Sequence, residues 1–136
     1  MDYTFYRIPI RPVTKKNSQQ IILVNGRPRI TQSRQYKKYE REALKFLRPV
    51  ALPIDYSVNV KCTYWLHPNK DGSLPKRLPD LPNLLNATDD VLIVAGILKD
   101  DNCMIVRTHD GSIVMFDKDH TECTEIEITR LEAANG

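Results

Sequence analysis

The sequence predicts an α+β fold, a single domain in which a mixed, mostly antiparallel sheet packs with two main helices. Three observations support this class. Several short segments alternate polar and apolar residues, two longer segments repeat apolar residues at helical spacing, and neither an internal repeat nor a linker divides the chain. With 41% hydrophobic content, residues 1–136 are enough for one packed core.

Short segments of alternating polarity predict the strands of the sheet. In residues 56–66 the apolar side chains recur at every second position, which is typical of a strand with one face on the core. Residues 2–10 alternate in part and predict a second strand. Further strands are expected at residues 104–108, 113–116 and 124–128, with a hairpin turn at residues 109–112 between the first two of these.

A hairpin is predicted around Asn25-Gly26. This dipeptide follows the apolar run at residues 20–24 and precedes residues 27–30. Both central residues of a tight hairpin turn need a positive φ, which Asn and Gly adopt readily. Pro28 cannot donate a backbone hydrogen bond, so the second strand is expected to be short or to lie at an edge.

A first helix of about four turns is predicted between Ser33 and Pro49. Its polar side is mostly basic, which indicates either a solvated face or a surface for phosphate contact. The apolar positions are Tyr36, Tyr39, Ala43, Phe46 and Leu47, and the basic positions are Arg34, Lys37, Lys38, Arg41 and Lys45.

A second helix is predicted at residues 82–95. Asp80 lies near its start, Pro82 falls in the first turn, where a missing N–H costs nothing, and Gly96 fits the C-terminal cap. Apolar residues cover most of this helix, so it is expected to be largely buried.

The charge is unevenly distributed along the chain, although the net charge is only +3. Residues 1–50 hold twelve Lys/Arg against three Asp/Glu, whereas residues 51–136 hold eight against fourteen. The two halves either attract each other within one fold or form a polyanion-binding surface beside a cation-binding carboxylate site. Charge alone does not separate these explanations.

The three cysteines predict a reduced, cytoplasmic protein. Cys62, Cys103 and Cys123 form neither an even set nor a CxxC pair, so neither a disulfide framework nor a zinc site is expected. No run of about 18 apolar residues is present, so no membrane span is expected. The first residues also lack the layout of a signal peptide.

The second predicted helix carries a polar stripe. Asn83, Asn86 and Asp90 share one face at helical spacing. Because buried polar groups need partners and a buried carboxylate needs a cation, the stripe is a candidate ion site.

Further carboxylates flank this helix. Asp80 precedes it and Asp100-Asp101 follow it, and they converge on the stripe if the chain doubles back. Oxygen ligands without nearby His or Cys favour Mg²⁺ or Mn²⁺ over zinc. Taken singly, Asp80 is also explained as a helix cap, and Asp100-Asp101-Asn102 as an ordinary turn.

The order of these residues resembles the core signature of the RusA-like Holliday junction resolvases. The signature is matched by Asp80-Leu81-Pro82-Asn83-Leu84, then Leu92, Gly96 and Asp100-Asp101. The resemblance extends to the loop at residues 12–18, the helix at 36–40 and the turn at 109–112, and it ends in the strand at 124–128. It therefore covers most of the chain.

The resemblance implies a homodimeric endonuclease that binds four-way DNA junctions and nicks two opposed strands with Mg²⁺ or Mn²⁺. Asp80 and Asp101 match metal-binding aspartates of the family, and Asp100 matches their neighbour. Asn83 matches the asparagine of the family, and Asp90 matches an aspartate on the same helix.

Two positions depart from the family pattern. The family commonly has a second aspartate where this chain has Pro82, and a lysine or glutamate where it has Asn86. Asp89 and Asp90 are candidates for the missing carboxylate on helix geometry.

A junction has approximate two-fold symmetry, so a two-fold dimer presents one site to each opposed strand. Contacts to the DNA backbone are expected to carry little sequence information and to weaken with salt. The candidates for these contacts are Lys15, Lys16, Asn17, Arg34, Lys37, Lys38 and Arg41.

Three alternatives remain open at this stage. The departures at Pro82 and Asn86 are compatible with a protein of the same fold that binds junctions or single strands but has weakened catalysis. A general metal nuclease acting on flaps or nicks is the second alternative. A scaffold whose acids and bases pair internally is the third.

Overall fold

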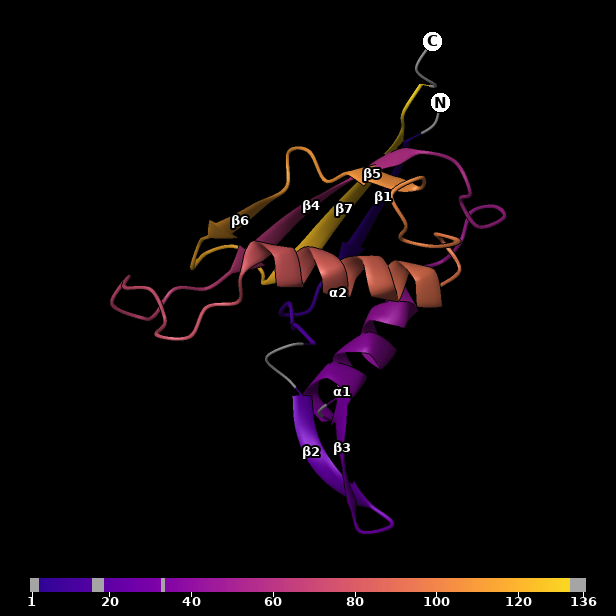
Figure 1. Cartoon of the computed structure of the whole chain (residues 1–136). Helices are drawn as coiled ribbons and strands as arrows, with labels where there is room; N and C mark the ends of the chain where they lie inside the picture. Colours follow the sequence, from indigo (N-terminus) through magenta and orange to yellow (C-terminus); the bar gives the residue numbers. More distant parts are fainter. Residues whose placement is uncertain (1–2, 16–18, 33, 133–136) are drawn as a thin grey trace.

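The computed structural model describes residues 3–15, 19–32 and 34–132. The main sheet has five strands, and Figure 1 shows α2 (Leu81–Val94) lying across one of its faces. Two helices and a mixed sheet confirm the predicted α+β class. No helix in these described ranges is long and apolar enough to cross a membrane.

The sheet is built around one long strand. β4 (Val58–Leu66) pairs antiparallel with β7 (Cys123–Arg130), which in turn pairs antiparallel with β1 (Tyr3–Ile8). On the other side of β4 lie β5 (Val106–Thr108) and β6 (Ile113–Phe116), both parallel to it.

The predicted hairpin turn at residues 109–112 is therefore wrong. β5 and β6 run in the same direction along one edge of β4, with an excursion of the chain between them. Side chains hold this excursion in place. Asn59 of β4 donates to the carbonyl of Asp110 and accepts from its N–H, and Ser112 Oγ accepts from the N–H of Cys62.

The core lies between the sheet and the helices. The alternating side chains of β4 from Val58 to Leu66 are buried, which confirms the pattern read from the sequence. α2 covers them, and Tyr64 of β4 forms a buried hydrogen bond of 2.7 Å with Thr88 of α2. The cysteines are free, as expected.

The first helix is shorter than predicted. α1 spans Arg34–Ala43 and continues as a 3₁₀ turn, η2, at Leu44–Phe46. Its tyrosines and Ala43 are buried in the core, whereas Phe46 is 44% exposed. The change to a tighter turn moves Phe46 off the buried stripe, and Leu47 takes its place in the core.

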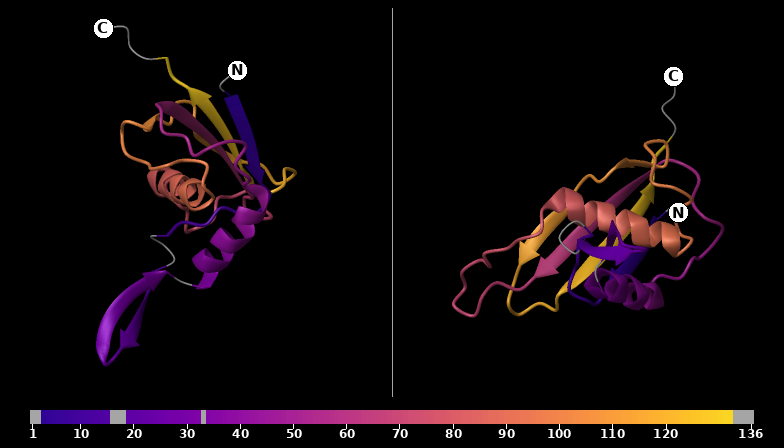
Figure 2. Two further views of the ribbon diagram at one scale, coloured as in Figure 1. Left: turned by 90° about the vertical axis from the view of Figure 1, so that its right-hand side faces the viewer. Right: turned by 60° about the horizontal axis from the view of Figure 1, so that its bottom comes forward.

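The predicted Asn25-Gly26 hairpin is confirmed. β2 (Gln19–Val24) and β3 (Arg27–Gln32) form a separate two-stranded sheet, and the turn residues have φ values of 53° and 76°. The left view of Figure 2 shows the hairpin extending away from the main sheet.

Candidate active site

Asp80 caps the N-terminus of α2. Its Oδ1 accepts from the backbone N–H of Asn83 at 3.0 Å, and its Oδ2 accepts from Asn83 Nδ2 at 3.0 Å. Pro82 occupies the first turn, as predicted. Asp80 is exposed, so its carboxylate lies at the positive end of the helix dipole and remains open to solvent.

A basic cleft opens beside Asp80. Its volume is about 610 Å³, and Pro79, directly before Asp80, forms part of its wall. The charged residues of the wall are Arg11, Lys76 and Arg77, and none of the described carboxylates lines the cleft. The other lining residues are Pro12, Val13, Thr14, Gln35, Leu66 and Leu78.

The exposed face of α1 extends the basic surface from this cleft. Gln35 of α1 lines the cleft, and the cations predicted on this helix are exposed to solvent. These exposed residues are Arg34, Lys37, Lys38 and Arg41. Lys16 and Asn17, two further candidates for DNA contact, lie outside the described residues.

Asp90 is bound to the N-terminal loop. Lys15 Nζ lies 2.8 Å from Asp90 Oδ2, and the same ammonium is 5.5 Å from the centre of the Tyr36 ring. Both side chains of the ion pair are about one-third exposed or less. Lys15 therefore neutralises Asp90 in the free protein.

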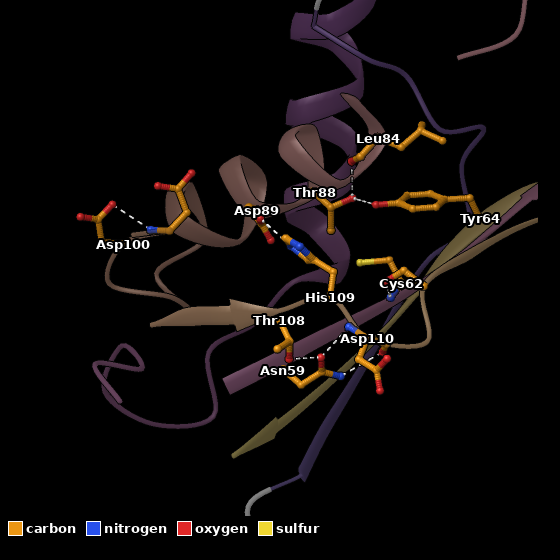
Figure 3. A network of polar contacts seen from close by, with 12 residues as sticks. Asn59, Cys62, Tyr64, Leu84, Thr88, Asp89, Asp100, Thr108, His109 and Asp110 are labelled. Atoms are coloured by element: carbon orange, nitrogen blue, oxygen red, sulfur yellow. Dashed lines mark hydrogen bonds and ion pairs between the residues drawn. The ribbon is translucent and has the colours of Figure 1, made fainter. Parts of the chain in front are cut away.

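Asp89 is the buried carboxylate of α2. It is 5% exposed, and His109 Nε2 lies 2.8 Å from its Oδ2, as Figure 3 shows. Burial raises the pKa of Asp89, the hydrogen bond and charge of His109 lower it, and the nearby carboxylates of Asp101 and Asp90 raise it. Within the described part of the chain, Asp89 Oδ1 has no hydrogen-bond partner.

Asp100 and Asp101 form a turn beyond the C-terminal end of α2. Asp100 Oδ1 accepts from the N–H of Asp101 at 2.8 Å, and its Oδ2 accepts from Asn102 Nδ2 at 3.1 Å. These hydrogen bonds, the backbone one first, lower the pKa of Asp100. Both aspartates are exposed.

The expected convergence of these carboxylates is only partial, because Asp101 and Asp90 lie near enough to Asp89 to raise its pKa, whereas Asp80 is placed at the N-terminal end of α2. Asp80 precedes α2 and Asp101 follows it, and a helix of 14 residues is about 21 Å long. Ligands of one Mg²⁺ lie about 2.1 Å from the ion. Among the described residues, no group of three His, Cys, Asp or Glu is placed to hold a metal. This arrangement does not fit an ion shared by Asp80, Asp90 and Asp101.

The polar stripe on α2 also differs from its prediction. Asn86 is exposed and Asn83 only partly buried, because this side of the helix faces away from the sheet. The buried polar residues of α2 are instead Thr88 and Asp89. Sequence reasoning missed the Asp89–His109 pair, whose only sequence signal was a histidine in the turn predicted at residues 109–112.

These features favour one class of protein. A basic cleft and helix face beside an exposed carboxylate suit a protein that binds a polyanionic strand and acts on it, and the sheet holds the helix that carries the carboxylate.

The family model described as Endodeoxyribonuclease RusA matches residues 9–129, and the chain belongs to this family. The match confirms the resemblance seen in the sequence and the enzyme class, a Holliday junction resolving endonuclease in general terms. A search of curated proteins found no significant match.

Proposed function

We propose that this chain binds four-way DNA junctions as a homodimer in the cytoplasm and resolves them by paired nicks in two opposed strands, in the presence of Mg²⁺ or Mn²⁺. The observation that carries the proposal is the basic cleft that ends beside Asp80. Its cations are available to a DNA backbone, and its wall includes Pro79, the residue directly before the exposed Asp80.

The cleft suits a strand bound through its phosphates. Lys76 and Arg77 come from the loop before α2, and Arg11 comes from the N-terminal loop, so two separate segments supply the cations of the cleft. Arg11 also lies 3.6 Å from Glu122, a weak contact because its side chain is 57% exposed. Contacts of this kind fix the position of the DNA without reading its bases.

We assign Asp80, with Asn83 as its hydrogen-bond partner, as the first catalytic candidate. Asp101, Asp100 and Asp90 remain candidates from the family signature. In the described part of the chain they form no group placed to hold one metal ion, so the assignment of Asp80 does not depend on such an ion.

A protein that binds junctions with weakened catalysis is the second candidate function. Two observations favour it. Pro82 stands where the family commonly has a second aspartate, and Lys15 forms an ion pair with the carboxylate of Asp90. In this case the cleft binds DNA, but the strand is not cut.

A supercoiled plasmid that extrudes a cruciform tests both functions. Paired nicks across the junction give linear DNA, whereas unpaired nicks give open circles. We expect linear product with Mg²⁺ and none with EDTA. Binding to a labelled junction without any cutting would support the second candidate, and equal cutting of flaps and linear duplex would contradict junction selectivity.

A further inference from the structure

The β2–β3 hairpin presents apolar side chains to solvent. Among the described strands it is paired only within itself, and it extends from the main body beyond α1 (Figures 1 and 2). Residues 21–29 are all exposed. An isolated two-stranded hairpin is marginally stable in water, so aliphatic residues on it are unfavourable unless they contact something.

The two faces of the hairpin differ in chemistry. Ile21 and Leu23 lie on one face, each 74% exposed, and Leu23 is paired with Pro28. The register places Ile22 opposite Arg29 and Val24 opposite Arg27 on the other face. One face is thus aliphatic, and the other combines aliphatic side chains with two arginines.

The charge around the hairpin favours a polyanionic partner. Residues 3–39 contain nine Lys/Arg and no Asp or Glu. The arginines of the hairpin therefore have no carboxylate close in sequence, and they continue the basic face of α1. A DNA backbone complements such a surface.

A second copy of the chain fits the hairpin less well. Two hairpins packed through their aliphatic faces would place Arg27 and Arg29 of both copies on the outside of one small unit, with no carboxylate close in sequence to offset their charge. A stable interface also buries about 1,200 Å² or more, which strands of six residues supply only in part.

We propose that the β2–β3 hairpin inserts at the branch point of the junction. Ile21, Leu23 and Pro28 pack against the exposed face of a base pair, and Arg27 and Arg29 bind the flanking phosphates. This inference rests on the proposed function and adds a specific contact to it. It explains why one small ribbon carries both aliphatic side chains and arginines.

Branch-point insertion has a physical basis. Aliphatic side chains inserted between base steps replace base stacking, and proteins that bend DNA use Leu, Ile and Pro as such wedges. Base pairs at a branch point are flanked by a strand exchange rather than by a continuous stack. Insertion there costs less unstacking than insertion into a linear duplex, so the hairpin favours junctions over duplex DNA.

The test compares the double variant I21S/L23S with wild-type. The matched control is V50S/L52S, which removes two aliphatic residues that are 79% and 89% exposed in a loop outside the hairpin. Affinity is measured on a four-way junction and on linear duplex, without divalent metal. A second junction carries 2-aminopurine at the branch point, and its fluorescence reports unstacking.

We expect I21S/L23S to lose about tenfold in junction affinity and the 2-aminopurine signal, with duplex affinity and the control unchanged. Junction affinity and signal equal to wild-type would overturn the insertion while leaving the proposed function intact. Equal losses on junction and duplex would also overturn it, as would a variant that becomes monomeric in sedimentation. Wild-type protein that binds no junction would contradict the proposed function itself.

Discussion

The two halves of α2 present their carboxylates in opposite ways. At the start of the helix Asp80 is exposed and accepts hydrogen bonds from the backbone and side chain of Asn83. In the second half Asp89 is buried and bound by His109 from the edge of the sheet. The first carboxylate reaches a substrate without rearrangement, whereas the second joins two layers of the fold. Exposure thus separates a group suited to catalysis from one suited to stability.

Asp80→Asn tests the catalytic half of this comparison and has the largest expected effect. We expect the single-turnover rate of junction cleavage to fall by roughly 100-fold or more. Folding is expected to be unchanged, because Asn caps a helix as well as Asp does. Asp119→Asn, which changes an exposed carboxylate away from α2, is the control and is expected to cleave normally. Normal cleavage by Asp80→Asn would remove Asp80 from the site.

His109→Ala tests the structural half. It leaves the carboxylate of Asp89 buried without its partner, so we expect the free energy of unfolding to fall by about 2–4 kcal/mol in urea denaturation at neutral pH. The double variant H109A/D89N removes the buried charge as well and is expected to recover part of the loss. If the double variant lost as much free energy of unfolding as H109A and D89N lose together, the two residues would not be coupled.

The pH dependence of stability sharpens the comparison further, with a smaller effect. The pKa of Asp89 is higher in the folded state than in the unfolded state. The protonated side chain therefore stabilises the fold below the unfolded pKa of 3.8, and this stabilisation is lost as pH rises through the folded pKa. The pKa of Asp100 is lower in the folded state than in the unfolded state. The ionised side chain therefore stabilises the fold above the unfolded pKa of 3.8, and this stabilisation is lost as pH falls through the folded pKa.

The difference in free energy of unfolding between wild-type and each variant is therefore expected to change with pH in opposite directions for the two carboxylates. With rising pH, wild-type is expected to lose stability relative to Asp89→Asn and to gain stability relative to Asp100→Asn. Urea titrations from about pH 3 to pH 6 measure both differences. Slopes of the same sign would contradict the assigned environments.

Much of the fold could be predicted because its signals are local. The Asn25-Gly26 turn, the cap at Asp80 and the alternation along β4 each depend on residues close in sequence. The pairing of β5 and β6 with β4 could not be predicted in this way. Alternation identifies a strand but not its neighbour, so residues 109–112 were interpreted as a hairpin turn.

The candidate site was predicted less completely, because it depends on distances through space. Acidic residues before and after α2 were expected to meet at one ion, but the described residues hold no group of three His, Cys, Asp or Glu placed for a metal, although Asp101 lies near enough to Asp89 to raise its pKa. The basic cleft also escaped prediction. Lys76 and Arg77 belong to a loop without periodicity, and only the fold places them opposite Arg11.

The cleft beside Asp80 is the central claim, and the salt dependence of junction binding tests it most directly. Binding of K76Q/R77Q is compared with that of K99Q/K118Q, which removes the same charge at exposed positions outside the cleft. We predict that the slope of log K against log salt decreases in magnitude by about two for the cleft variant and stays at the wild-type value for the control. A cleft variant with the wild-type slope would contradict the account, because the strand would then pass elsewhere.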